Sequence, residues 1–492
     1  YLNYTKKGVY NPLTGLYEQD MQAERQVKKK ALFPHILVLL FFAILIAAIL
    51  TWIIPAGKYE RVLDENSKRM VIDPLSFQYV ESTPVGPFGA FVSIEEGLIE
   101  AANITFLIFA AFSAMYILEK SGALDAAIVK AVDITRAKPA LTNVIIVLLM
   151  IILSVWGSTG TMSYEEIIAF IPIFIALCIA LGYDSLVAIG ISVVPVGVGF
   201  ASATLNPFTI GVAQTIAELP MFSGLWYRVI VLVVMTIINI AFVLVYARKV
   251  KADPTKSLVY GIDYTDLTLD DERMKTEMTL PRKLSILVLF LGILVMAYGL
   301  INKGWYINQV AAIFMIVSIA VGIINRWAPN QLANAYVEGL SKGVLSALVV
   351  GFARGILVVF TKGQILDTIV FTFASWLQNL SLYASAVGML FFQSFLNFLI
   401  PSGSGQAAVS MPIMTPLADL IGMKRQIAVL IFQFGDGFSN LLWPTGFMII
   451  ACTVARIPLN KYYRFMLPFF ILCLLAQIVF VLVAVAIGYG PF

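Results

Sequence analysis

Two short polar stretches, Trp156-Gly157-Ser158-Thr159-Gly160-Thr161 and Pro401-Ser402-Gly403-Ser404-Gly405-Gln406, interrupt otherwise apolar sequence, one in each half of the chain. Glycine and serine break a helix here and leave backbone N–H and C=O groups without helical partners. Lipid cannot satisfy these groups, so such breaks occur only where protein or a water-filled cavity surrounds them. A matched pair of interrupted hydrophobic segments is typical of a transporter's binding site.

The composition is that of a multi-pass membrane protein. Hydrophobic residues make up 60% of the 492 residues and charged residues only 13%, against roughly half and a quarter in a soluble domain. The three cysteines lie apart in apolar runs, and the single histidine, His35, begins the first span. No cluster of His, Cys and carboxylates indicates a metal or cofactor site, and no nucleophile–base set indicates an enzyme. We expect a small-molecule substrate and the lipid bilayer as partners, and no nucleic acid.

Apolar runs of about 20 residues predict membrane-spanning helices. Nine such runs occur, at 36–55, 98–119, 185–219, 225–247, 284–302, 307–325, 340–361, 426–452 and 463–488. The segments 141–182 and 384–422 are left over, and each has a polar stretch in its middle. We interpret both as re-entrant hairpins. Short amphipathic pieces at 122–135 and 364–378 predict interfacial helices.

The distribution of Lys and Arg predicts the orientation in the cytoplasmic membrane. With the N-terminus inside, the basic stretch 248–283 and the other basic loops also lie inside, as the positive-inside rule requires. The odd number of spans then predicts that the C-terminus lies outside.

The two halves of the chain resemble each other. Glu96-Gly97-Leu98 recurs as Glu338-Gly339-Leu340, and the pair Lys120 and Asp125 recurs as Lys362 and Asp367, always at an offset of 242. By the span count the two halves run in opposite directions, which is typical of the inverted repeats of secondary transporters. Four segments follow: a polar cytoplasmic segment 1–30, a first repeat 31–247, a basic loop with a connecting helix 248–306, and a second repeat 307–492.

The two polar stretches are candidate substrate-binding tips. Their hydroxyl groups donate and accept hydrogen bonds, and their glycines let the backbone approach a ligand. The second arm of the first hairpin begins near Met162, and its free N–H groups would favour a carboxylate. The candidate residues are Ser158, Thr159, Gly160 and Thr161 in the first tip and Ser402, Gly403, Ser404 and Gly405 in the second.

The span that follows each hairpin is itself broken. Gly197 to Pro207 and Phe434 to Pro444 combine glycines with a proline, which removes a backbone donor and favours unwinding. Unwound carbonyls beside Asn206 and Asn440 are candidate ligands for a cation or a substrate ammonium. The plainer alternative is a proline kink packed by glycines.

Charged residues inside the spans are costly and usually functional. Asp436 lies between two glycines at the second break and is the strongest candidate. Glu165 and Glu166 follow the first tip, and because they point about 100° apart, one of them is expected to face the site. Arg354 could hold a substrate carboxylate, pair with a buried acid or form a structural ion pair. Trp156, Phe438 and Trp443 are candidates for stacking on a cation, with core packing as the alternative.

Three runs carry a resemblance to a known family. Lys30 to Tyr59, Ile400 to Ala407 and Gln433 to Gly437 resemble the YfcC family, grouped with the DcuC-like C4-dicarboxylate carriers and the ArcD-type arginine/ornithine exchangers. The resemblance covers about residues 30–490. It implies an elevator transporter of the ion transporter superfamily, often a homodimer. The tips occupy the positions of the Ser-Asn-Thr motifs of related dicarboxylate symporters, but neither tip contains Asn, so their sodium sites are not carried over.

The sequence therefore predicts an all-α secondary transporter with inverted repeats, two re-entrant hairpins and two broken spans. The candidate site contains Asp436 and one of Glu165 and Glu166, but only one positive side chain, Arg354. This excess of negative charge favours a substrate with a cationic end, such as arginine or ornithine. The tip N–H groups would hold its α-carboxylate and Asp436 its distal cation. The alternative is a proton- or sodium-coupled symporter of C4-dicarboxylates or another small carboxylate, with Asp436 in coupling. A channel or receptor is disfavoured by the internal inverted pairs.

Overall fold

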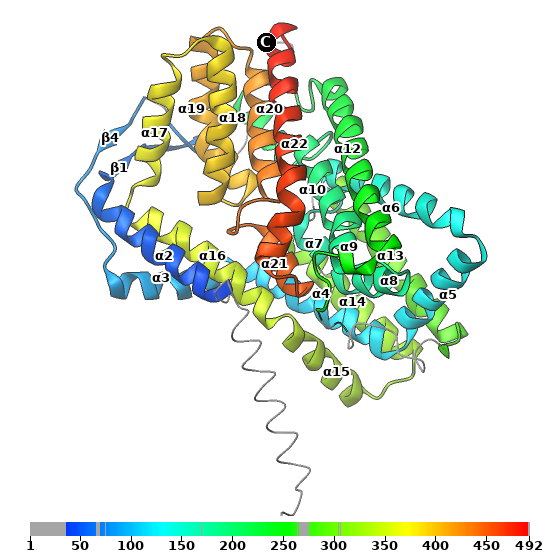
Figure 1. Cartoon of the computed structure of the whole chain (residues 1–492). Helices are drawn as coiled ribbons and strands as arrows, with labels where there is room; N and C mark the ends of the chain where they lie inside the picture. Colours follow the sequence, from blue (N-terminus) through cyan, green and yellow to red (C-terminus); the bar gives the residue numbers. More distant parts are fainter. Residues whose placement is uncertain are drawn as a thin grey trace, which may run out of the picture.

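The computed structural model describes residues 36–490 apart from 65–68, 74, 169, 263, 265–274, 304 and 306, and these residues are mostly helical (Figure 1). The polar segment 1–30 lies outside the described residues. The helices of the first half are α2 Ile36–Ile53, α3 Pro87–Glu100, α4 Ala102–Lys120, α5 Ala123–Ala137, α6 Pro139–Thr159, α7 Tyr164–Ile168, α8 Ile171–Ala180, α9 Ser185–Ile191, α10 Val193–Ser202, α11 Ile210–Ile216 and α12 Leu225–Ala252.

The connecting region and the second half follow in the same way. The 3-10 turn η1 Pro254–Lys256 and α13 Leu280–Asn302 precede the second series of helices. Its members are α14 Ile307–Ile324, α15 Pro329–Lys342, α16 Val344–Lys362, α17 Leu366–Leu377, α18 Leu382–Leu399, α19 Gly403–Leu420, α20 Arg425–Ser439, α21 Phe447–Val454 and α22 Leu459–Ala486.

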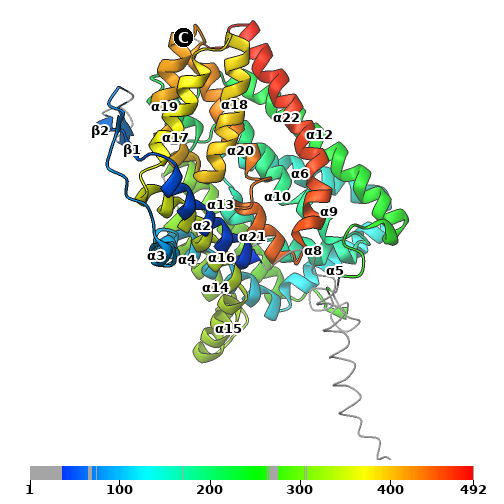
Figure 2. The ribbon, with the colours of Figure 1, turned by 60° about the vertical axis from the view of Figure 1, so that its left-hand side comes forward.

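The two series of helices match in order and length. The bounds of α3 and α4 recur 242 residues later as those of α15 and α16, and α12 and α22 are each 28 residues long. In Figures 1 and 2 the α18–α19 hairpin lies at the upper end of the molecule, whereas α5 and α8 lie lower down. The division into repeats 31–247 and 307–492, and their inversion across a bilayer, stay predictions.

Eight helices of the described residues are long and apolar enough to cross a membrane, α4, α12, α16 and α22 among them. The structure divides several of the predicted spans. The predicted spans 98–119 and 340–361 begin too early, because α3 ends before Ala101 and α15 before Gly343. The spans 185–219 and 426–452 are divided into shorter helices at their glycine-rich and proline-containing breaks.

The second arm of the first hairpin also differs from the prediction of one helix starting near Met162. It consists of the short α7 and of α8, which restarts at Ile171 with Pro172 in its first turn. Proline lacks an N–H group and is well tolerated in the first turn of a helix. The corresponding arm of the second hairpin does not divide, since α19 continues through Pro412 and Pro416.

The repeated Glu-Gly-Leu motif forms reciprocal contacts between the halves. α3 packs on α16, and α15 packs on α4. Glu96 Oε2 lies 2.5 Å from Lys362 Nζ, and Glu338 Oε2 lies 2.8 Å from Lys120 Nζ. Each pair joins one half to the other, so the shared residues that reveal the repeat also hold the two halves together. We call α3, α4, α15 and α16 the scaffold.

Replacing Gly97 with alanine should destabilise this scaffold. A Cβ at Gly97 would lie 2.5 Å from both Gly351 O and Gly355 N, so α3 and α16 would have to separate. Overpacking of this kind costs about 1–3 kcal/mol, and thermal melting of the purified protein should record a lower midpoint. Gly86→Ala is the matched control, because a Cβ there meets no atom within 4 Å. Equal melting midpoints for both variants would contradict the close crossing.

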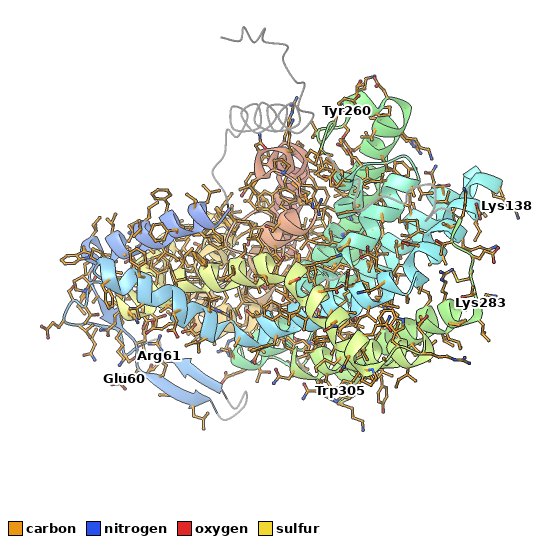
Figure 3. The ribbon with its side chains drawn as sticks, turned by 90° about the horizontal axis from the view of Figure 1, so that it is seen from below. Glu60, Arg61, Lys138, Tyr260, Lys283 and Trp305 are labelled. Carbon is orange, nitrogen blue, oxygen red and sulfur yellow. The ribbon has the colours of Figure 1, made fainter. Side chains whose placement is uncertain are left out.

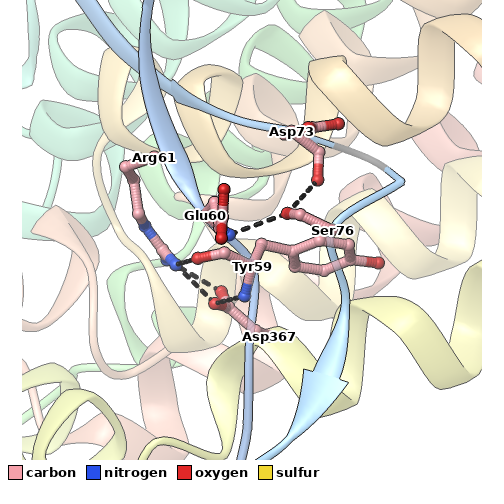
Figure 4. A network of polar contacts seen from close by, with 6 residues as sticks. All are labelled: Tyr59, Glu60, Arg61, Asp73, Ser76 and Asp367. Atoms are coloured by element: carbon pink, nitrogen blue, oxygen red, sulfur yellow. Dashed lines mark hydrogen bonds and ion pairs between the residues drawn. The ribbon is translucent and has the colours of Figure 1, made fainter.

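Two small antiparallel ladders add strands to the predicted all-α fold. β1 Gly57–Lys58 pairs with β4 Gln78–Tyr79, and β2 Arg61–Asp64 pairs with β3 Arg69–Ile72. The Arg61 guanidinium donates to both carboxylate oxygens of Asp367 on α17, at 2.5 and 2.9 Å (Figure 4). The Tyr59 N–H donates to the same carboxylate at 2.9 Å. Burial, together with the Asp367 charge, raises the pKa of the Tyr59 phenol.

Four charged residues lie at opposite ends of the molecule. Seen from below, Glu60 and Arg61 lie at one end, and Lys138 and Lys283 lie at the other (Figure 3). The long helices between them expose mainly apolar side chains, as the surface of a membrane protein does.

Candidate substrate-binding site

The second polar stretch forms the tip between α18 and α19. Ser402 has an extended backbone (φ −153°, ψ 109°), so α19 begins at Gly403 and its first N–H groups lack intrahelical acceptors. A Cβ added to Gly403 would lie 2.5 Å from Thr209 Cγ2 and 2.8 Å from Asp436 Oδ2. Glycine is therefore required here because this backbone is pressed between the two broken spans.

The first polar stretch forms the tip between α6 and α7. Gly160 adopts the left-handed conformation (φ 72°) that ends α6, and the Thr161 N–H donates back to Trp156 O at 3.0 Å. The Ser163 N–H donates to Glu166 Oε2 at 2.8 Å, which is the carboxylate half of a capping box. Glu166, one of the two adjacent glutamates, therefore caps the N-terminus of α7.

The breaks of the two spans meet these tips. Asn206 Oδ1 accepts a hydrogen bond from the Phe208 N–H at 2.9 Å, and the side chain packs against the first tip. Asn440 Nδ2 donates to Asp436 O at 2.8 Å. The Tyr164 O–H, from the helix after the first tip, donates to Gly437 O at 3.1 Å on the second broken span. This bond ties the two halves together at the site.

The tips and breaks enclose a space of about 200 Å³, which we call the tip cavity. The scaffold closes its remaining side through α3, α4 and α16. The lining residues are Glu100, Asn103, Ile104, Gly160, Ser163, Tyr164, Glu165, Glu166, Phe200, Asn206, Phe208, Thr209, Ile307, Arg354, Pro401, Ser402, Gly403, Ser404, Asn440 and Phe447.

Most of the candidate residues from the sequence line this cavity. These are Gly160, Asn206, Ser402, Gly403, Ser404 and Asn440, with the charged residues Glu165, Glu166 and Arg354. That they bind a substrate stays a prediction.

The remaining candidates, Ser158, Thr159, Thr161, Gly405 and Asp436, do not line the cavity. The Ser158 hydroxyl lies 2.9 Å from Thr204 Oγ1, and the hydroxyls of Thr159 and Thr161 lie 2.8 Å apart. Their hydrogen-bonding capacity is used inside the protein.

Asp436 lies behind the second tip rather than on the cavity wall. Its side chain is completely buried, and its Oδ1 accepts a hydrogen bond from Asn397 Nδ2 at 2.8 Å. Three oxygen atoms around it have no hydrogen-bond partner within the described part of the chain: Asp436 Oδ2, Asn397 Oδ1 and Thr209 Oγ1. Asp436 is not among the residues that line the cavity, and its Oδ2 lies close to Gly403. Direct contact of Asp436 with the substrate stays a prediction. No group of three or more His, Cys, Asp or Glu among the described residues could hold a metal ion.

The charges on the cavity wall are unequal. Glu100, Glu165 and Glu166 supply three carboxylates, and Arg354 supplies the one positive charge among the lining residues. Arg354 is half-buried in the middle of α16 and forms no hydrogen bond or salt bridge with any residue that the structure describes. The alternative interpretation, a structural ion pair of Arg354, therefore lacks an acidic partner among the described residues. An unpaired guanidinium at this depth is available to an anionic group of a ligand.

Sequence reasoning missed the scaffold side of the cavity. Glu100 and Asn103 stand at the junction of α3 and α4, and their signal was a carboxylate and an amide at the start of a predicted span. The aromatic candidates were also misplaced. Trp443 Nε1 donates to Ser394 O, and neither it nor Trp156 nor Phe438 lines the cavity. The aromatic rings at the cavity belong to Tyr164, Phe200, Phe208 and Phe447.

A helical multi-pass membrane protein with two polar tips around a small charged cavity belongs to the class of membrane transporters. Residues 33–486 match the family DcuC, described as C4-dicarboxylate anaerobic carrier. The chain is 31% identical over 479 residues to the "Putative basic amino acid antiporter YfcC" of Escherichia coli (strain K12), covering 90% of this chain and 94% of that protein. It therefore belongs to the DcuC family of transporters, among relatives of YfcC, which confirms the resemblance seen in the sequence.

Two further comparisons were found. An uncharacterized protein of Haemophilus influenzae (strain ATCC 51907 / DSM 11121 / KW20 / Rd) is 28% identical over 485 residues, covering 90% of this chain and 94% of that protein. The crystal structure of the Alcanivorax borkumensis YdaH transporter is 14% identical and covers 93% of this chain and 100% of that chain, with a TM-score of 0.44.

Proposed function

We propose that this protein exchanges basic amino acids of the arginine and ornithine type across the cytoplasmic membrane. One observation carries the proposal: three carboxylates and one guanidinium line the tip cavity, so its formal charge is negative by two when all four groups are ionised. Buried charges need partners of opposite sign. A cavity of this sign disfavours a dicarboxylate and favours a substrate with one anionic and two cationic groups.

The polarity of the cavity suggests how such a substrate would lie. Arg354 and the open N-terminus of α19 at Ser402–Ser404 would share the α-carboxylate, because both favour an anion. Asn440 lines the cavity, and its Oδ1 accepts no hydrogen bond from the described residues, so it is placed to accept one from the α-amino group. Glu165 and Glu100 would hold the distal cation. In this proposal Glu165 and Glu100 take the role that the sequence predicts for Asp436.

An elevator movement fits the composition of the cavity wall. The tips and broken spans would move as one unit against the scaffold, which contributes Glu100 and Arg354. In Figure 2, α21 lies next to α16, and the two helices are in contact. In this proposal the α16–α21 contact is part of the sliding boundary. We also propose the homodimer, the inward N-terminus and the outward C-terminus that the sequence predicts.

Two more cavities continue along that boundary and suggest a route. A space of about 30 Å³ touches Val350 and Arg354, and a space of about 340 Å³ touches Ser346. These residues are successive turns of α16. A water molecule needs about 10–15 Å³, so the small space has room for water, and we propose that it joins the tip cavity to the larger one during transport.

A second candidate function is symport of a small carboxylate coupled to a proton or a cation. The observation in its favour is the buried Asp436, whose Oδ2 has no hydrogen-bond partner in the described part of the chain. Asn397 Oδ1 and Thr209 Oγ1 are also without partners. A buried carboxylate with unused oxygens nearby is suited to hold a proton or a small cation.

An exchange assay separates the two functions. Proteoliposomes preloaded with ornithine should accumulate labelled arginine at least about tenfold over empty liposomes, because exchange is obligatory in an antiporter. Exchange should be saturable and independent of a sodium gradient. Labelled succinate under an imposed proton or sodium gradient is the parallel arm. Succinate uptake without arginine exchange would establish the symporter and refute the antiporter.

A further inference from the structure

Arg228 is a completely buried arginine in the first turn of α12. Its guanidinium donates to Ala203 O at 3.0 Å, to Thr204 O at 3.3 Å, and to the carbonyls of Phe222 and Ser223 at 3.2 and 2.7 Å. The phenol oxygen of Tyr489 accepts a fifth bond at 3.4 Å. The partners are thus backbone carbonyls and a hydroxyl. A buried charge is tolerated only with such partners, so this arrangement holds specific backbone in place.

The backbone that Arg228 holds is the first break. α10 ends at Ser202, and Ala203 adopts a left-handed conformation (φ 36°, ψ 66°) that is unfavourable for a residue with a Cβ. Asn206, three residues later, lines the tip cavity. The guanidinium stabilises the strained turn immediately before this residue.

The second break is held from the corresponding position. Tyr462 is the fourth residue of α22, as Arg228 is the fourth of α12. The Tyr462 O–H donates to Leu441 O at 2.9 Å, and the Tyr463 O–H donates to Leu442 O at 2.9 Å. α20 ends at Ser439, and the cavity residue Asn440 lies between that end and the held carbonyls.

We infer that Arg228, Tyr462 and Tyr463 are positioning residues of the transport site, which hold Asn206 and Asn440 in place by binding the carbonyls at the two breaks. The inference rests on the proposed site in the tip cavity. The carbonyls at residues 203, 204, 441 and 442 already accept hydrogen bonds from these side chains, whereas binding of a cation or an ammonium by carbonyls beside Asn206 and Asn440 stays a prediction. α12 and α22, which pack on α10 and α20, accordingly belong to the moving unit.

The test compares the double variant Tyr462→Phe/Tyr463→Phe with Tyr227→Phe. The Tyr227 phenol donates to Phe480 O at 2.5 Å, so the control loses the same kind of bond away from both breaks. The double variant should raise the KM for arginine exchange roughly tenfold, because each unpaired buried carbonyl disfavours the held conformation. Tyr227→Phe should leave this KM unchanged. Arg228→Met should act as the double variant does, with Arg228→Lys in between.

Hydrogen exchange measured by mass spectrometry gives a readout that does not depend on the substrate. Amides of residues 200–208 should exchange faster in Arg228→Met, and those of residues 438–446 faster in the double tyrosine variant, since local opening becomes easier. If KM and these amides stay unchanged in folded variants, or if Tyr227→Phe has the same effects, the inference is refuted. If the unaltered protein does not exchange arginine, the proposed function fails, and hydrogen exchange still decides the positioning role. If Arg228→Met does not fold, the tyrosine variants decide.

Discussion

Replacing Arg354 with glutamine is expected to lower arginine–ornithine exchange on the order of 100-fold, because one partner of a desolvated charge pair is lost at a cost of about 2–5 kcal/mol. Arg354 is the single cationic side chain on the cavity wall and has no salt-bridge partner among the described residues. Without substrate its replacement removes no hydrogen bond or salt bridge with the described residues, so the melting midpoint should stay within about a degree or two of the unaltered protein. Initial rates in proteoliposomes, with melting curves of the same samples, make the measurement.

Two further variants make this result specific. Arg354→Lys keeps the charge but not the planar pair of donors, and is expected to retain roughly a tenth of the exchange. Arg425→Gln is the matched control. Arg425 pairs with Asp419 at 2.8 Å and with Glu218 at 2.7 Å, away from the tip cavity. Those neighbouring carboxylates raise the pKa of its guanidinium, so the residue is fully charged at any working pH. An Arg354→Gln protein with normal KM would refute the proposed carboxylate contact.

Replacing Glu165 with glutamine is expected to change what the cavity prefers. Glu165 is half-buried on the wall, next to the first tip. A hydrogen bond to a charged group contributes about 1.5–3 kcal/mol, so the apparent affinity for arginine should fall by roughly 10- to 100-fold. Citrulline, which has nearly the shape of arginine but a neutral end, should lose little. The ratio of the two inhibition constants against labelled ornithine is the quantity to measure.

Two acids of α3 provide the comparisons for Glu165, Glu95 outside the cavity and Glu100 on its wall. Glu95→Gln removes an exposed carboxylate of α3 that does not line the cavity, and it should leave the ratio unchanged. Glu100→Gln should lower the preference for arginine over citrulline only in the conformation of this structure. Glu100 belongs to the scaffold, and in the proposed elevator movement the tips move away from it. If Glu165→Gln weakens the binding of arginine and of citrulline equally, the Glu165 carboxylate does not bind the cationic end of the substrate.

Some parts of the site were readable from local sequence because their physical cause is local. Gly160 ends a helix with a positive φ, and Ser402 starts one with an extended backbone, so the two tips followed from residue type. The sequence also indicated the repeat, since Glu96 and Glu338 are separated by the same 242 residues as the other matched pairs. What the offset could not convey is that each glutamate pairs with a lysine of the other half. The reciprocal pairing depends on how α3 and α15 cross their partners.

Other parts depended on distance through space. Asp436 looked like the main ligand because it is a charge inside an apolar span, but packing of α20 on α18 directs its carboxylate to Asn397. Glu100 looked like an ordinary charge near a span end, yet the scaffold brings it to the cavity. Arg228 carries the same kind of signal, a charge inside the predicted span 225–247, but its role became visible only with its five acceptors.

The amino-acid order by itself determined that the chain spans a membrane, and it predicts that the chain is built twice from one plan and that two glycine–serine stretches mark the place where a solute would lie. These conclusions need only hydrophobicity, spacing and the conformational freedom of glycine, which act over a few residues. The folded arrangement decided which carboxylates reach the cavity, which stay behind it, and which carbonyls at the breaks remain available. Such choices depend on contacts between helices far apart in the chain, such as the bond between Tyr164 and Gly437, which are 273 residues apart, and no local property of the chain encodes them.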